Sequence, residues 1–224
     1  MRLLLLNPNR SVWITERVAA PARSVLRAGE VLDTVTSATG PDAVTSADQL
    51  AAAALEVQTL AALHGKGYDA IILGISLDCG LHETRAARYP QPVIGMTEAA
   101  CLAASLAGPK FGLLTIGSGM AMSFQAHVRM LGLQDRFVGV AAPDCPDAFK
   151  AESALFSPEI VQLLADGVRD LVARGAHSVV LAGAVLCGCG PVLRAKVGVP
   201  VWEGPACAVG MARTLNTPLG RSLY

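Results

Sequence analysis

Short apolar segments alternate along the chain with longer stretches in which alanine and leucine recur every three to four residues. The short segments have no alternating polar positions, which is typical of parallel strands covered by helices on both faces. The longer stretches have the period of amphipathic helices. Strands are predicted at residues 3–6, 70–73, 93–95, 112–116, 178–181 and 199–202, and the clearest helices at 47–64, 98–107 and 160–174. This order predicts an α/β protein with doubly wound parallel sheets and right-handed crossovers.

The chain also repeats itself weakly, with an offset of 108 residues. Residues 2–7 correspond to 110–115, residues 67–73 to 175–181, and Pro92 to Pro200. Cys79 corresponds to Cys187, and each lies twelve residues after a glycine that precedes a predicted strand. A repeat of this length predicts two flavodoxin-like lobes, residues 1–108 and 109–216, related by a pseudo-twofold axis. A C-terminal tail, residues 217–224, follows them.

The segments that follow the predicted strands are rich in glycine and small polar residues. They are residues 7–11, 74–80, 115–119 and 183–190. Because open α/β sheets bind ligands beyond the carboxyl ends of their strands, we expect these segments to line one crevice between the lobes. Their glycines let backbone N–H groups approach an anion closely, and the helices that follow favour negative charge. The sequence therefore predicts a small-molecule site in this crevice.

The composition narrows the classes of partner. Eighteen basic residues balance eighteen acidic ones, and aromatic residues make up 4%, so neither a nucleic acid nor a membrane surface is expected as a partner. The apolar segments are far shorter than the roughly 20 residues that span a membrane, and residues 1–6 are too short for a secretion signal. We therefore expect a soluble, cytoplasmic protein. Its six cysteines are expected to be free thiols, and their spacing indicates no metal site.

Several short motifs follow one another in an order that carries a family resemblance. They are Asn7-Pro8-Asn9, Gly40-Pro41 followed by Ser46, Asp78-Cys79-Gly80-Leu81, Pro92-Val-Ile-Gly-Met-Thr-Glu-Ala-Ala, Phe111-Gly-Leu-Leu-Thr115 and Gly198-Val-Pro-Val. In this order they resemble the aspartate/glutamate/hydantoin racemase superfamily, and hydantoin racemases in particular. Gly74-Ile75-Ser76-Leu77 also resembles a segment of arylmalonate decarboxylase, from the same superfamily. The resemblance covers nearly the whole chain.

The resemblance implies an enzyme that needs no cofactor and uses two cysteines, one per lobe, facing each other across the substrate. One thiolate removes a proton next to a carbonyl or carboxylate, and the opposite thiol returns it on the other face. The positions that align with these cysteines hold Gly74 or Ile75 in the first lobe and Gly183 in the second. The resemblance also implies a small hydantoin-like or carboxylate-bearing substrate and a homo-oligomer.

Neither of these aligned positions holds a cysteine, so three hypotheses for the chemistry are open. In the first, Cys79 and Cys187 act as opposed acid and base, because the repeat makes them equivalent; the alternative for both is an ordinary buried thiol. In the second, Asp78 directs water at a five-membered cyclic amide, a ureide or its thio-analogue in a hydrolase or lyase reaction, or the protein is a related decarboxylase. The alternative for Asp78 is a cap of the helix that opens at Gly80. In the third, the protein binds a small acid without turnover.

The candidate binding residues lie where predicted strands end. Asn9, Ser76, Thr115, Ser118 and the backbone amides of Gly183 and Ala184 are expected to hold the polar groups of the substrate. In the second hypothesis, Ser76 and the segment at Thr115 bind the polarised oxygen or sulfur atom. An ordinary hydrogen bond within its loop is the alternative for Ser76.

Overall fold

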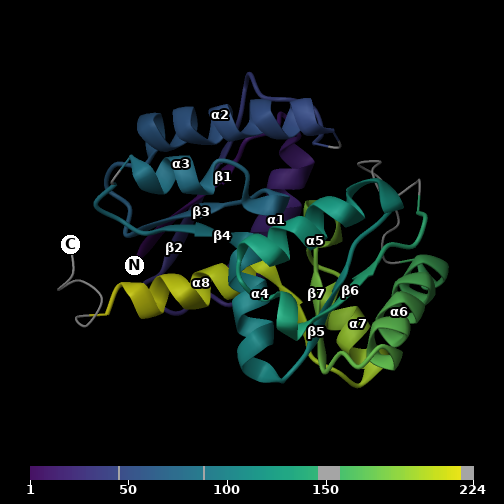
Figure 1. Cartoon of the computed structure of the whole chain (residues 1–224). Coiled ribbons are helices and arrows are strands. Elements are labelled where there is room, and N and C mark those ends of the chain that lie inside the picture. The colour runs from purple at the N-terminus through teal and green to yellow at the C-terminus, as the bar shows by residue number, and fades with distance from the viewer. Residues whose placement is uncertain (45, 88, 146–156, 218–224) are drawn as a thin grey trace.

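The computed structural model describes residues 1–44, 46–87, 89–145 and 157–217, and it holds two lobes, each with a four-stranded parallel sheet (Figure 1). The first sheet has the order β2-β1-β3-β4 and the second the order β6-β5-β7-β8. The strands are β1 (Arg2–Asn7), β2 (Val31–Thr36), β3 (Ala70–Leu73), β4 (Val93–Gly95), β5 (Phe111–Leu114), β6 (Phe137–Ala141), β7 (Ser178–Leu181) and β8 (Val201–Glu203). The helices are α1 (Val12–Ser24), α2 (Ala47–His64), α3 (Leu81–Ala86), α4 (Met96–Ala107), α5 (Ala121–Met130), α6 (Pro158–Ala173), α7 (Gly190–Val197) and α8 (Gly204–Leu215). The predicted class of two α/β lobes is confirmed.

The sequence pattern does not predict β2 and β6, which lie at one edge of each sheet. β2 reads Val-Leu-Asp-Thr-Val-Thr and is mostly half-buried, and β6 is half-buried along most of its length. An edge strand has a neighbour on one side only, so its sequence tolerates polar positions that a central strand excludes. The remaining strands lie within about two residues of their predicted bounds, a usual margin for element ends. Residues 218–224 of the predicted tail lie outside the described residues.

Equivalent elements of the two lobes are 108 residues apart: β3 and β7, β4 and β8, and α4 and α8 begin and end at equivalent positions. α4 packs against β5, β7 and β8 of the second sheet, whereas α8 packs against β3 and β4 of the first. In Figure 1, α8, in yellow, runs beneath the first sheet, and α4 stands beside the second. The halves of the chain thus exchange their last helices. Residues 108 and 109 therefore mark a boundary of the repeat but not of the packing.

The exchanged helices pack against each other where the lobes meet. Ala99 of α4 and Ala208 and Ala212 of α8 are fully buried in one apolar cluster, and such small side chains allow a short distance between helix axes. Gly204, the first residue of α8, lies so close to α4 that a Cβ atom on it would be 2.6 Å from the carbonyl oxygen of Met96. Met96 is the first residue of α4, so the equivalent ends of the two helices meet.

β1 is an inner strand of the first sheet and packs against helices on both faces. Leu3 and Leu5 belong to a cluster that includes residues of α1 and α8, and Leu4 and Leu6 to a cluster that includes residues of α2. All four are fully buried, and full burial of one leucine side chain stabilises a fold by roughly 1.5–3 kcal/mol. Because successive side chains of a strand point to opposite faces, a strand covered on both faces needs a continuous apolar run.

We expect Gly204→Ala to lower the free energy of unfolding by about 1–3 kcal/mol, because the added methyl group overlaps the Met96 carbonyl. Gly210→Ala, on the same helix, is the matched control, since a Cβ atom there has no neighbour within 4 Å. That control is expected to stabilise the helix by about 0.5–1 kcal/mol. Urea unfolding of both variants measures the difference, and equal effects would contradict the close approach of α8 to α4.

An ion pair ties the end of α8 to the first lobe and makes stability depend on pH. Arg213 donates to the two carboxylate oxygens of Glu30 at 2.8 and 2.6 Å, and this hydrogen bonding lowers the pKa of Glu30 to about 2. A carboxyl group with a lowered folded-state pKa stabilises the fold above its unfolded pKa and loses that contribution as the pH falls. We expect Glu30→Gln to cost about 1 kcal/mol at pH 7. The difference from the unsubstituted protein disappears as the pH falls from about 4.5 to about 2.

The control for this titration is Glu16→Gln, which removes the more exposed pair with Arg23. Its effect at pH 7 is expected to be smaller, because solvent screens an exposed pair. Unfolding by urea at several pH values provides the measurement. A Glu30→Gln difference that does not change between pH 7 and pH 2 would rule out the pair as the cause.

Candidate functional site

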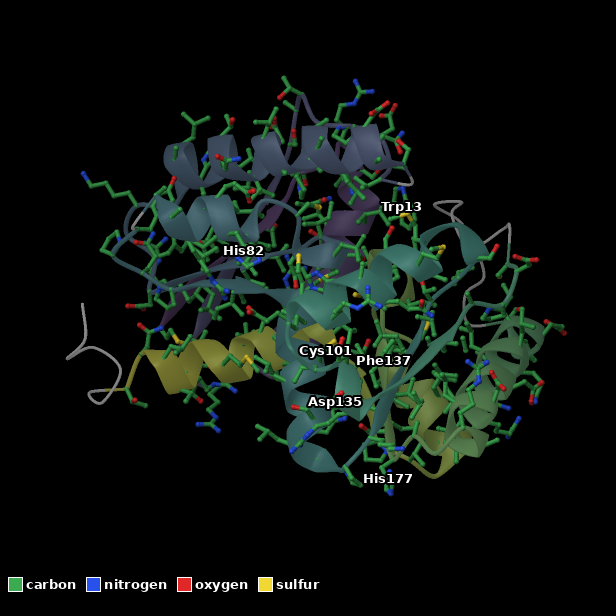
Figure 2. The ribbon with its side chains drawn as sticks, in the orientation of Figure 1. Trp13, His82, Cys101, Asp135, Phe137 and His177 are labelled. Carbon is green, nitrogen blue, oxygen red and sulfur yellow. The ribbon has the colours of Figure 1, made fainter. Side chains whose placement is uncertain are left out.

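A pocket of about 340 Å³ lies between the lobes, where the segments after β1, β3, β5 and β7 meet. Its walls are mostly apolar, formed by Trp13, Ile14, Val44, Leu50, Ile75 and Leu77 of the first lobe and by Ile116, Met120, Phe124 and Val185 of the second. Trp13, labelled in Figure 2, lies near the start of α1, where this lobe meets the other. The volume and the apolar walls suit a small organic molecule with few polar groups.

Asn9 brings an amide group to the pocket from the loop after β1. Its Oδ1 accepts hydrogen bonds from Asn7 Nδ2 at 3.0 Å and from the backbone N–H of Ser11 at 3.0 Å, and its own backbone N–H donates to Asn7 Oδ1. Asn7 is fully buried and also donates to Thr15 at 2.9 Å, so its hydrogen bonds connect the loop to α1. Because the Asn9 oxygen is occupied, its Nδ2 is the group left to donate to a ligand.

Ser76 and Ala184 join the two lobes inside the pocket. Ser76 follows β3 and Ala184 follows β7 at the equivalent position of the repeat, and the Ala184 N–H donates to Ser76 Oγ at 3.0 Å. The preceding Gly183 has a φ of 134°, a conformation that residues with a side chain rarely adopt. A hydroxyl oxygen that accepts this bond still has its own proton to donate. The structure therefore places one hydroxyl donor on the pseudo-twofold axis.

The second lobe also contributes Thr115, the residue after β5. Thr115 is buried, lines the pocket, and its backbone N–H donates to the Ala141 carbonyl of β6 at 2.9 Å. Ser118 lies apart from it: the side chain is exposed on the 3₁₀ turn Ser118–Met120 and is not among the residues that line the pocket. Of the predicted binding residues, Asn9, Ser76, Thr115, Gly183 and Ala184 come together here, and Ser118 does not.

A segment after β2, residues 37–44, covers one side of the pocket. Arg10 N–H donates to the Pro41 carbonyl at 3.0 Å, and Ser11 Oγ donates to the Asp42 carbonyl at 2.8 Å. The Arg10 guanidinium also pairs with the Asp42 carboxylate at 2.8 Å. Asp42 is the one ionisable side chain among the described residues that line the pocket.

Comparison with known proteins identifies the family. The family model described as Asp/Glu/hydantoin racemase matches residues 3–212. The chain belongs to the Asp/Glu/hydantoin racemase family. A hydantoin racemase of Paenarthrobacter aurescens is 27% identical over 218 residues, which cover 96% of this chain and 91% of that protein.

Several solved structures share the fold of this chain. An allantoin racemase from Klebsiella pneumoniae superposes with a TM-score of 0.84 at 24% identity, over 96% of this chain and 87% of that one. Arylmalonate decarboxylase superposes with a TM-score of 0.62 at 14% identity, over 96% of this chain and 92% of that one. Both likenesses concern the two-lobed architecture. The predicted resemblance to the racemase superfamily, to hydantoin racemases and to arylmalonate decarboxylase is confirmed.

The structure does not bring Cys79 and Cys187 to the pocket of this racemase-family protein. Cys79 packs against the cluster under α2, with Sγ 3.6 Å from the Ser76 carbonyl, and Cys187 is buried in the other large cluster. Burial raises the pKa of Cys79 to about 12 and also raises that of Cys187. Neither sulfur is a thiolate at neutral pH, and the two lie in separate apolar clusters. The geometry therefore favours the packing interpretation of both cysteines.

Asp78 also lies outside the pocket lining, directly behind Leu77. Its side chain is fully buried, and its carboxylate accepts from the backbone N–H groups of Thr97 at 2.9 Å and Glu98 at 2.7 Å. It thus caps α4, and not the helix after Gly80 as the capping alternative expected. A carboxylate held in this way has no path to a substrate in the pocket, so the geometry does not support its use as the base of a hydrolase.

Several residues that line the pocket are not predicted from the sequence. Trp13 and Phe124 belong to helices, and Asp42 and Val44 follow the unpredicted strand β2. An Asn-Pro-Asn loop at the end of β1 signals that the next helix begins at the crevice, which would have pointed to Trp13. The described residues hold no group of three or more His, Cys, Asp or Glu side chains that could bind a metal. None of the helices in the described ranges is long and apolar enough to span a membrane.

We expect both thiols to react slowly with iodoacetamide in the folded protein at pH 7.5, because their raised pKa values suppress the thiolate. Burial also blocks access to Cys187, whereas Cys79 is half-buried. Peptide mapping by mass spectrometry would find residues 79 and 187 largely unlabelled after a reaction that labels them completely in guanidinium chloride. Rapid labelling of both in the folded protein would restore the paired-thiol hypothesis.

Proposed function

We propose that this member of the racemase family is an isomerase that binds a hydantoin-like cyclic amide in the pocket between its lobes. It exchanges the proton on the ring carbon next to a carbonyl group. The observation that carries the proposal is the meeting of donor groups from both lobes, Asn9, Ser76 and Thr115, within apolar walls. The names of two similar proteins, hydantoin racemase and allantoin racemase, support a five-membered ureide ring as the ligand.

The fit of the ring rests on the division of the pocket into polar and apolar parts. A hydantoin ring presents carbonyl oxygens and N–H groups at its edge, which suit the hydroxyl and amide groups beside the pseudo-twofold axis. A substituent on the ring would contact Trp13, Ile14 and Phe124. The cavity of about 340 Å³ is at the small end of the range for ligand sites, which suits one ring with one substituent.

The reaction needs stabilisation of the charge that develops when the C–H bond breaks. The electron pair of that bond moves into the ring carbonyl, and the oxygen becomes negatively charged. The Ser76 hydroxyl, which accepts from Ala184 N–H, donates to this oxygen. The proton leaves to the carboxylate of Asp42 or to a water molecule that Asp42 binds. A water molecule on the opposite face of the carbon donates a proton to it, the electron pair on the oxygen returns to the carbonyl, and the product is the mirror image. The hydroxide left behind takes up the proton that Asp42 releases to solvent.

Deuterium exchange tests the proposal. One enantiomer of 5-benzylhydantoin, incubated with the protein in D2O, is expected to lose its C5–H signal in NMR spectra and its optical rotation faster than in buffer alone. Ser76→Ala is expected to slow this exchange by about 100-fold, the usual effect of removing one oxyanion donor. Ser24→Ala, at the end of α1, is the matched control and leaves the rate unchanged. Exchange no faster than in buffer would refute the isomerase proposal.

The two cysteines give an independent prediction. Because neither thiol lines the pocket, Cys79→Ala and Cys187→Ala are expected to keep the exchange rate within about twofold, apart from any loss of folded protein. Circular dichroism of each variant measures the folded fraction, so that the rate refers to folded molecules. Near-complete loss of exchange in both folded variants is the outcome that the paired-thiol hypothesis requires.

One observation favours a second candidate function, binding without turnover. Ile75 and Gly183 line the pocket from opposite lobes, and the motif alignment sets the family's cysteines at Gly74 or Ile75 and at Gly183. A pocket with no thiol at these positions is suited to hold a ring without moving its proton. Saturable binding of 5-benzylhydantoin in calorimetry, together with the buffer rate of deuterium exchange, identifies this function.

A further inference from the structure

We propose that Asp78 and His127 form a buried latch between the lobes, and that Asp78 acts as a positioning residue through Ser76. The latch sets the contact between Ser76 and Ala184, and with it the direction of the hydroxyl donor. The proposal rests on the proposed function in one respect only, namely that the Ser76 hydroxyl donates a hydrogen bond to a ligand in the pocket.

The carboxylate of Asp78 joins three elements. Besides the two backbone N–H groups at the start of α4, its Oδ2 lies 3.1 Å from Nε2 of His127 on α5. The Asp78 side chain is fully buried and that of His127 is 6% exposed, so water does not compete for these bonds. α5 belongs to the second half of the chain and also carries Phe124, which lines the pocket. One carboxylate therefore fixes a loop of the first lobe against a pocket-lining helix of the second.

The loop that Asp78 holds has an unfavourable backbone. Leu77 has a φ of 62° and Asp78 a φ of 49°, and they are the only residues other than glycine with positive φ in the described ranges. Residues with a side chain adopt this left-handed region at a cost that other contacts must offset. Leu77 and Ser76 both line the pocket, so the strained turn faces the ligand site. The bonds of the Asp78 carboxylate are the contacts that hold it.

The second lobe has a comparable carboxylate bridge, which lies within that lobe. There the carboxylate of Glu203, at the end of β8, accepts from the N–H of Gly188 at 2.5 Å. Glu203 is equivalent to Gly95 in the repeat, and a Cβ atom on Gly95 would lie 2.6 and 2.7 Å from the oxygens of Asp78. One buried carboxylate therefore ties the loop after β3 to the start of α4 in the first lobe, and another ties the loop after β7 to the end of β8 in the second.

The two bridges differ in one respect. In the loop after β7 of the second lobe, the residues with positive φ are the glycines Gly183 and Gly188, and the Glu203 carboxylate accepts from Gly188 of its own lobe. In the first lobe Leu77 and Asp78, which correspond to Val185 and Leu186, have positive φ, and the Asp78 carboxylate reaches across to His127. Asp78 is therefore suited to couple the two walls of the pocket, whereas Glu203 stabilises its own loop.

Amide hydrogen exchange tests the latch without any ligand. The Ala184 N–H reports on its bond to Ser76, and the N–H of Val180, in the buried strand β7, reports on global unfolding. In Asp78→Asn we expect Ala184 to exchange at least tenfold faster while Val180 is unchanged. Ser76→Ala gives the reference rate for a broken contact, and Asp78→Asn adds nothing to it in the double variant. An unchanged Ala184 rate, or equal acceleration at both amides, overturns the proposal.

Variants of His127 keep the test decisive if Asp78→Asn does not fold. His127→Leu removes the donor to Asp78, whereas His127→Gln retains a side-chain N–H that can reach the same oxygen. We expect the leucine variant to accelerate exchange at Ala184 and the glutamine variant to restore most of the protection. Equal rates in the two variants overturn the latch.

These readouts separate the latch from the proposed function. If the protein neither binds 5-benzylhydantoin nor exchanges its proton, the proposed function fails, and the Ala184 measurement still decides the latch. If the protein catalyses exchange and Asp78→Asn changes neither the Ala184 amide nor the rate, the latch alone fails.

Discussion

α4 and α8 each leave the half of the chain that contains them and cover the sheet of the other half. Neither sheet can bury both of its faces without a helix from the opposite half, so the lobes are held together by their cores. The close approach of Gly204 to Met96 brings equivalent points of the two halves into contact. The crevice therefore lies over a packed core, and its width is set by side-chain volumes. A site built in this way is preorganised, which suits a reaction that depends on well-placed donors.

Much of this architecture can be predicted from the sequence. Parallel strands buried on both faces must be continuously apolar, so β1, β3 and β7 can be recognised from a single sequence. The edge strand β2 carries polar residues and the edge strand β6 is interrupted by Gly139, so neither is recognised in the sequence. With β2, the covering segment at Asp42 is also missed. The offset of 108 residues reveals that α4 and α8 are equivalent. It carries no information on which sheet each helix covers, because that is a matter of packing across the pseudo-twofold axis.

Prediction of the site succeeds and fails for a related reason. Position after a strand determines which loops reach the crevice, and so Asn9, Ser76 and Thr115 are found in the pocket. Equivalence in the repeat also relates Cys79 to Cys187, and the structure gives both the same backbone angles, a φ of −58° and a ψ of 134°. Each follows a short 3₁₀ turn, however, and its side chain enters an apolar cluster. Sequence spacing identifies equivalent residues but does not give the direction of a side chain after an irregular turn.

The conformation of Gly183 makes the two lobes unequal as starting points for protein engineering. Ile75 has a φ of −135° and a ψ of 140°, which any residue adopts. A reactive side chain introduced there therefore needs no change of the backbone conformation. Gly183, with a φ of 134°, does not accept a grafted side chain unless the peptide on either side rotates. That rotation would turn the Ala184 N–H away from Ser76. Introducing a nucleophile on this side therefore removes the existing hydrogen bond between the lobes, so the two arrangements are mutually exclusive in one chain.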